Sequence, residues 1–157
     1  MWSLRNFLSF LLPFKKNINE LTIHNSLHCK VFIYKSNLFN GVCFDKNSRG
    51  VLIHESVIMD GKQCGISKKW YKNGNTKEVC YYSNGKKNGL SKLWFTNGQI
   101  SHQSYYKNGL KHGLSKKWYN NGQLKYESVY KNDKLEGLNK VWDEIGKQIS
   151  NDRVKKD

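Results

Sequence analysis

The chain has 157 residues, enough for one domain with a short extension, and its hydrophobic and aromatic residues make up 38% and 13%. Its formal net charge is +15, and a surface this basic attracts phosphate groups or acidic proteins. Most of the thirteen glycines recur at regular positions, which indicates ordered turns and argues against disorder.

The N-terminal segment, from Met1 to Lys16, is the one apolar stretch that does not repeat. Leu4, Phe7, Leu8 and Leu11 fall at helical spacing, which predicts a short amphipathic helix. Pro13 interrupts the run and no small-residue cleavage site follows, so a secretory signal fits poorly. The run is also shorter than the roughly 20 residues that cross a bilayer. We expect residues 1–20 to cap the structure that follows, with contact to a membrane surface as the alternative.

Beyond this segment a single fixed period dominates the chain, equal to the spacing between Trp70 and Trp94. It is marked by four equally spaced tryptophans, each with a glycine five residues before it and another four residues after it: Trp70, Trp94, Trp118 and Trp142. Such a period indicates one small structural unit stacked on copies of itself.

Each unit predicts a β-hairpin, because short segments alternate with Asn-Gly pairs that tolerate the positive φ of tight turns. After each Trp we predict a three-residue loop with glycine in the left-handed position. This register places the tryptophans opposite aliphatic or β-branched residues, which are good cross-strand partners. These partners are Thr76, Ile100 and Leu124.

The repeat continues in weaker form at both ends. Lys46 stands where Trp is expected, and Asn37 and Asp133 stand where turn glycines are expected. We therefore place the array at residues 21–150, about five hairpins, and expect residues 151–157 to fray. The predicted fold is all-β, an elongated single-layer antiparallel sheet of stacked hairpins with a short N-terminal helix.

The register also predicts a face for candidate stacking and binding residues. Alternation puts tryptophans, tyrosines and lysines on one face, where the Trp rings stack from repeat to repeat and lysine stems cover them. We expect this to be the better-packed face of the sheet. The candidates are Trp70, Trp94, Trp118, Trp142, Tyr82, Tyr106, Tyr130, Lys68, Lys92, Lys116 and Lys140.

The sequence carries no pattern of catalytic, cofactor-binding or metal-ligating residues. Its four cysteines form no C-x-x-C pair and do not follow the repeat, which is typical of reduced thiols in an intracellular protein. The histidines do not recur from one repeat to the next, and the glycines lie in turns and do not form a phosphate-binding loop. We expect a protein that is not an enzyme and binds no cofactor.

Gly113-Leu-Ser-Lys-Lys-Trp-Tyr-Asn-Asn-Gly-Gln-Leu124 and its copies resemble the MORN repeat. The similarity extends to the variant found in bacterial proteins labelled toxin–antitoxin antitoxins and in arrays of large DNA viruses. It spans Gly61 to Gly146, is thin over residues 21–60, and does not cover residues 1–20. The resemblance implies a twisted single-layer sheet and a scaffold without activity of its own.

Three functions follow as hypotheses. The first is a non-catalytic scaffold that presents the aromatic–lysine face to a protein partner with an acidic surface, or to a second copy. The second is an antitoxin that neutralises a partner toxin. The third is a peripheral binder of anionic membrane or nucleic acid through its lysines. We expect an intracellular, cytoplasmic protein that is not secreted, with attachment at a membrane or packaging in an assembly such as a virion as alternatives.

Overall fold

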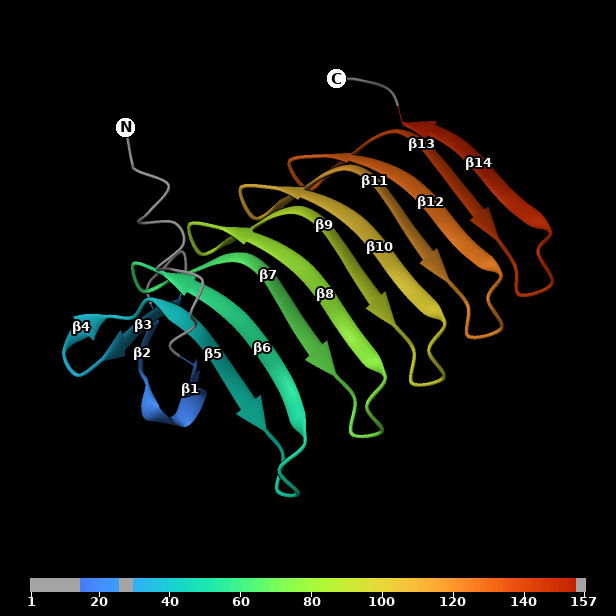
Figure 1. Cartoon of the computed structure of the whole chain (residues 1–157). Coiled ribbons are helices and arrows are strands. Elements are labelled where there is room, and N and C mark those ends of the chain that lie inside the picture. Colours follow the sequence, from blue (N-terminus) through green and yellow to red (C-terminus); the bar gives the residue numbers. More distant parts are fainter. Residues whose placement is uncertain (1–14, 26–29, 155–157) are drawn as a thin grey trace, which may run out of the picture.

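The computed structural model describes residues 15–25 and 30–154, which form an eleven-stranded sheet and a three-stranded sheet (Figure 1). The large sheet begins with β1 (Lys15–Asn17), which pairs in parallel with β5. The ten strands after it pair antiparallel in chain order: β5 (Gly41–Lys46), β6 (Leu52–Met59), β7 (Lys62–Trp70), β8 (Thr76–Ser83), β9 (Lys86–Trp94), β10 (Ile100–Lys107), β11 (Leu110–Trp118), β12 (Leu124–Lys131), β13 (Lys134–Trp142) and β14 (Gln148–Val154).

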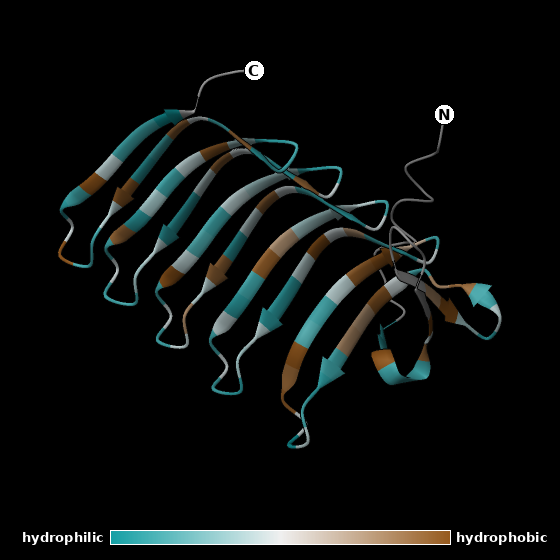
Figure 2. Ribbon diagram, turned by 180° about the vertical axis from the view of Figure 1, so that it is seen from behind, coloured by the Kyte–Doolittle hydropathy of each residue, from teal (hydrophilic) through white to brown (hydrophobic). Residues whose placement is uncertain are grey.

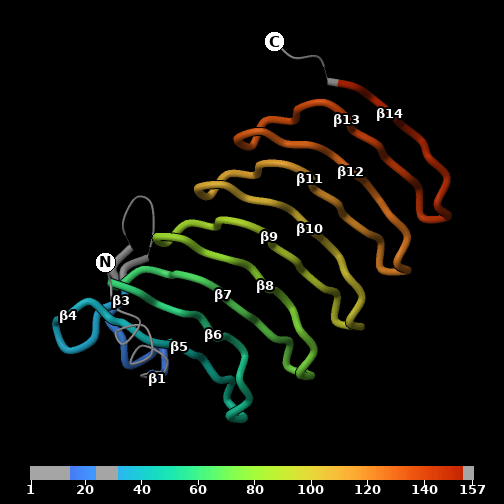
Figure 3. Tube along the Cα trace, turned by 45° about the horizontal axis from the view of Figure 1, so that its top comes forward, coloured from blue at the N-terminus to red at the C-terminus, as the bar shows by residue number. Residues whose placement is uncertain are grey.

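This arrangement confirms the predicted all-β stack of hairpins. The strands bow in the same sense and the hairpins follow one another in chain order along the array (Figures 1 and 3). Hydrophobic and hydrophilic bands alternate along the strands (Figure 2), as they do when side chains point to opposite faces in turn. The predicted N-terminal helix falls on residues 1–14, outside the described residues.

The long loops have the predicted form. In the β7–β8 loop, Tyr71 N–H donates to Asn75 O at 2.8 Å and Gly74 N–H donates to Tyr71 O at 3.0 Å. Three residues remain in the loop, and Gly74 has a φ of +87°. The same pair of hydrogen bonds closes the other four long loops. Trp70, Trp94 and Trp118 are accordingly opposite Thr76, Ile100 and Leu124.

A bulge just after each long loop reverses the face to which each later side chain of that strand points. Trp94 pairs with Ile100, but Leu93 pairs with His102, so Ser101 is left over. The extra residue on one strand reverses the later alternation of side chains. Equivalent bulges occur in every hairpin of the array, at Ile53, Lys77, Ser101, Lys125 and Ile149.

The side chains on each face of the sheet are consequently not the ones expected from simple alternation. The tryptophan face carries the Trp residues, and its opposite, the serine face, carries a row of small side chains paired strand to strand. This serine row consists of Cys43, Ser56, Ser67, Cys80, Ser91, Ser104, Ser115 and Ser128.

The serine row is the best-buried line of the array, with exposed fractions between 0% and 8%. The four repeat tryptophans are only half-buried. The expectation that the tryptophan face is the better-packed face is therefore wrong. Small side chains at mid-strand let the longer ones on either side close over them, so a single layer excludes water there.

The start of the array is covered by residues that were expected to belong to it. Residues 21–38 were expected to belong to the array, but β2 (Thr22–Asn25), β3 (Lys30–Tyr34) and β4 (Asn37–Leu38) form the separate small sheet. A 3₁₀ turn, η1 (Ile18–Glu20), precedes it.

This small sheet packs on the serine face of the first hairpin. Phe32 and Phe39 form a buried cluster with Leu21, Cys43 and Ile58. The backbone is also joined, because Phe32 N–H donates to Gly61 O at 2.7 Å. The described residues between 18 and 39 thus cover one end of the sheet.

The last strand extends beyond the expected end of the array. Residues from 151 onward were expected to fray, yet β14 continues to Val154 and pairs with β13 at every position from Asn151 to Val154. The continuation follows from pairing with a full-length neighbouring strand, which supplies backbone partners to residues with weak strand preference. Residues 155–157 lie outside the described part.

Candidate interaction surface

The tryptophan face consists of two apolar strips with a charged row between them. One strip is the line of tryptophans with the residues opposite them, which include Ile100 and Leu124. The other is a line of aliphatic and tyrosine side chains: Val42, Val57, Ile66, Tyr81, Leu90, Tyr105, Leu114, Val129 and Leu138. Tyr81 and Tyr105 are 45% and 42% exposed, so this apolar strip is open to solvent.

The charged row between the strips is net positive. Lys68, Lys92, Lys116 and Lys140 lie on this face as predicted, against two acids, Glu55 and Glu127, at equivalent positions of neighbouring strands. Lys116 and Glu127 form an ion pair of 2.7 Å. A partly exposed ion pair of this kind adds little stability, so the row contributes more to the positive charge of this face than to the stability of the fold.

The structure corrects the placement of three candidates. Tyr82, Tyr106 and Tyr130 were expected beside the tryptophans, but they pair with Gly65, Gly89 and Gly113 on the serine face. The bulge after each long loop is the reason. Tyr81 and Tyr105, which the sequence reading did not select, take their place on the tryptophan face.

Stacking of the tryptophan rings is also not seen. The aromatic ring pair among the described residues is Tyr34–Phe39, with ring centroids 6.4 Å apart. Equivalent tryptophans are two strands apart, about 9.6 Å, which is too far for ring contact. Lysines were expected over the tryptophans, but in the described array the lysine–ring contacts involve Phe44 and tyrosines, for example Lys111 over Tyr130 at 5.0 Å.

The serine face carries the best-buried charge of the array. Glu78 is 9% exposed and accepts hydrogen bonds from Lys69 at 2.7 Å and Lys87 at 2.9 Å. Burial alone raises the pKa of this carboxyl, but the two lysine hydrogen bonds outweigh burial and the pKa is lowered. Glu78 therefore joins three strands as a buried carboxylate.

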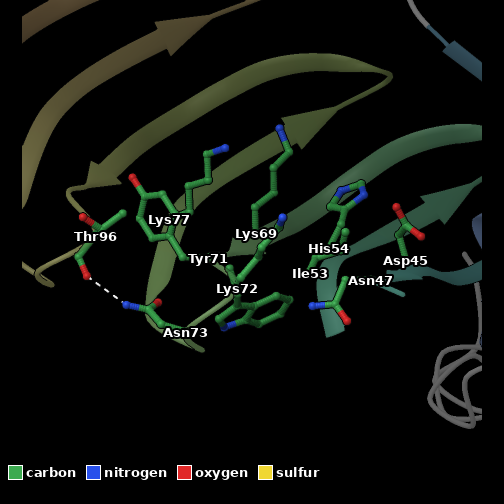
Figure 4. Close-up of a pocket in the computed structure, with 11 residues that line it drawn as sticks. Asp45, Asn47, Ile53, His54, Lys69, Tyr71, Lys72, Asn73, Lys77 and Thr96 are labelled. Carbon is green, nitrogen blue, oxygen red and sulfur yellow. Dashed lines mark hydrogen bonds between the residues drawn. The ribbon is translucent and has the colours of Figure 1, made fainter. Parts of the chain in front are cut away.

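A groove of about 730 Å³ opens where the β5–β6 and β7–β8 hairpins meet their long loops. Its walls include His54, Lys69, Tyr71 and Lys77, whose side chains project toward the same side in Figure 4. Lys77 Nζ lies 5.6 Å from the centre of the Tyr71 ring. The groove combines positive charge with aromatic surface.

The long loops that border this groove are tied to the next hairpin by side chains. Asn73 accepts the N–H of Asn75 through Oδ1 and donates from Nδ2 to Thr96 O at 3.1 Å (Figure 4). Asn97 and Asn121 repeat both bonds one and two hairpins later. In these three long loops, the Asn of the Asn-Gly pair thus shapes its own turn and joins it to the following one.

Among the described residues, no group of three or more His, Cys, Asp or Glu is arranged to hold a metal ion. Among the same residues, no helix has the length and apolar character needed to cross a membrane.

No curated protein matches the chain. The family model of the MORN repeat variant matches three consecutive segments, residues 63–84, 87–108 and 111–132. Each segment starts in an odd-numbered strand, includes its long loop and ends at the short turn after the next strand, so the matched unit is the hairpin described above. Residues 63–132 of this chain thus hold three consecutive repeats that match the MORN repeat variant.

Proposed function

We propose that the chain is a non-catalytic interaction protein whose tryptophan face binds an acidic surface of a protein partner. The observation that carries this proposal is the apolar strip on a sheet face that no second layer of the described residues covers, with Tyr81 and Tyr105 more than 40% exposed. Extended apolar surface of this kind marks interfaces, because exposing it to water is unfavourable.

The chemistry of the face indicates the partner. The four lysines of the charged row outnumber its two glutamates, and the whole chain carries +15. Positive charge between two apolar strips suits a partner surface with aspartate or glutamate side chains flanked by apolar residues. An antitoxin role is one form of this function, in which the acidic partner is a toxin.

The test pairs two substitutions on the face with two in the loops. Tyr81→Ser with Tyr105→Ser removes the exposed rings of the apolar strip. Val51→Ser with Ile145→Ser removes exposed apolar side chains, 41% and 83% accessible, that lie in long loops. Partners captured by the unaltered chain are identified by mass spectrometry, and their affinity is measured by calorimetry with each variant.

The proposal predicts an acidic partner that loses at least tenfold in affinity with the tyrosine variant and less than twofold with the loop variant. The affinity should also fall as salt is raised from about 50 to 500 mM, because screening weakens the attraction between charges. Equal losses with both variants, or a partner with a basic binding surface, would overturn it. Neutralisation of the partner's toxicity in cells expressing both proteins would identify the antitoxin form.

A further inference from the structure

The serine face carries two copies of one four-residue cluster, two repeats apart. Each contains His, Lys, Tyr and Lys at corresponding positions, and we name them cluster 1 and cluster 2. Cluster 1 is His54, Lys69, Tyr71 and Lys77, and cluster 2 is His102, Lys117, Tyr119 and Lys125.

The geometry of the two clusters agrees as well as their composition. His54 pairs with Lys69, and His102 pairs with Lys117, each across neighbouring strands. The second lysine lies over the tyrosine ring in both, at 5.6 Å in cluster 1 and 4.8 Å in cluster 2.

The tyrosine of each cluster is also held in the same way. Its hydroxyl donates to the carbonyl of the Trp in the following repeat, Trp94 in cluster 1 and Trp142 in cluster 2. Corresponding residues of the clusters are four strands apart, about 19 Å.

The repeat between them lacks this chemistry. Glu78, Leu93, Phe95 and Ser101 stand at the four positions, so the full set of one histidine, two lysines and one tyrosine recurs two repeats apart and is missing between. Cluster 1 borders the groove of about 730 Å³, where Lys72 adds a further cation and Asp45 an acid.

Cluster 2 has the stronger positive field. In cluster 1, Lys69 is paired with Glu78, whereas none of the ion pairs found among the described residues involves Lys117 or Lys125. Burial and the nearby Lys117 and Lys111 lower the pKa of His102, so the lysines and not the imidazole carry the positive charge of cluster 2 at neutral pH. Such a cluster is stabilised by an anion that lies between its members.

We propose that clusters 1 and 2 form two contact points for one single-stranded nucleic acid, which crosses the serine face along the direction in which the hairpins stack. Two separated cationic points suit an extended polyanion better than a small anion. The aromatic ring in each cluster favours nucleic acid over an acidic polypeptide, because bases stack on tyrosine while carboxylates do not. The site lies on the face opposite the proposed protein-binding surface and does not depend on it.

The test measures the binding of a fluorescent twelve-residue oligothymidylate to the full chain by anisotropy. Lys77→Ala with Lys125→Ala removes one lysine from each cluster. Lys92→Ala with Lys140→Ala removes the same charge from the tryptophan face and serves as the matched control. Circular dichroism confirms that both variants fold.

The cluster variant should bind at least tenfold more weakly and the control variant within twofold of the unaltered chain. The slope of log affinity against log salt should fall by about 1.4 for the cluster variant, since each phosphate contact on a single strand contributes about 0.7. Equal losses in both variants would show that binding follows total charge and would overturn the proposal.

Stacking is tested separately at Tyr119. Tyr119→Phe keeps the ring and should retain binding, whereas Tyr119→Leu should lose about fivefold or more, in keeping with the energy of one base–tyrosine stack. If both bind alike, or if a twelve-residue polyglutamate binds with equal affinity and the same dependence on Lys77 and Lys125, the nucleic-acid assignment is wrong.

Discussion

The hydroxyl of Tyr71 donates a hydrogen bond of 2.7 Å to the backbone carbonyl of Trp94, which belongs to the next hairpin. Tyr119 makes the same bond to Trp142 at 3.0 Å. Between them, Phe95 stands at the equivalent position without a hydroxyl. A tyrosine hydroxyl thus links neighbouring long loops at two junctions, and the junction between them lacks this bond.

Tyr71→Phe should lower the free energy of unfolding by about 1 kcal/mol, because the Trp94 carbonyl loses a part-buried partner. Phe95→Tyr should raise it by a similar amount, because it supplies the missing bond to Trp118. Urea denaturation followed by tryptophan fluorescence measures both. A loss with Phe95→Tyr would show that the loop there has no room for the hydroxyl.

Glu78→Gln should destabilise the chain by about 2 kcal/mol at pH 7, because it leaves two part-buried lysines without their counter-charge. Glu127→Gln is the control and should cost less than about 1 kcal/mol, because Glu127 forms only a single ion pair, with Lys116, and its side chain is more exposed than that of Glu78.

The effect of Glu78 should depend on pH. The folded-state pKa of its carboxyl is lowered, so its stabilisation is complete above the ordinary value of 4.5 and is lost as the pH falls through the folded-state pKa. Unfolding measured from pH 7 to pH 3 should therefore show the difference between wild type and Glu78→Gln shrinking below pH 4.5. A difference that stays constant would contradict the double ion pair.

Ser91→Ala should leave the stability unchanged or raise it. Its Oγ is the one buried side-chain polar atom of the described residues found without a hydrogen-bond partner, so removing it ends an uncompensated desolvation. Ser104→Ala should instead cost about 1 kcal/mol, because Ser104 Oγ and Ser115 Oγ are hydrogen-bonded at 2.8 Å. Thermal unfolding compares the pair, and equal effects would show that the hydroxyl bond has no energetic role.

A repetitive sequence of this kind makes its turns predictable but not its bulges. The three-residue loops and the pairing of Trp94 with Ile100 follow from local chemistry, because Asn-Gly at a fixed position selects one turn. The bulge cannot be predicted in this way, because the unpaired residue of each bulge is of a different kind from repeat to repeat, as Lys77, Ser101 and Ile149 show. Without the bulge, Tyr106 was placed on the wrong face.

The residues of the serine row and of the two clusters recur at repeat spacing in the sequence. Without the strand pairing, however, the sequence does not show which of them lie side by side or on which face. Ser67, Ser91 and Ser115 share one position of the repeat, yet small polar residues are usually exposed and so gave no sign of a core. His54 and His102 stand two repeats apart, and the strand pairing is what brings each beside a lysine. Cover of the first hairpin by β2–β4 depends on long-range packing of Phe32 and Phe39, for which the repeat carries no pattern.

Trp94→Ala should destabilise the array by about 3 kcal/mol, because the half-buried ring packs opposite Ile100 between neighbouring hairpins. Trp142→Ala should cost less than half as much, because its ring is opposite Gln148 in the last hairpin of the described array. Calorimetric unfolding of the two variants measures the difference. Equal costs would mean that the stabilisation by these rings comes from their own strand and not from cross-strand packing, and the tryptophan strip would then be available to a partner without loss of stability.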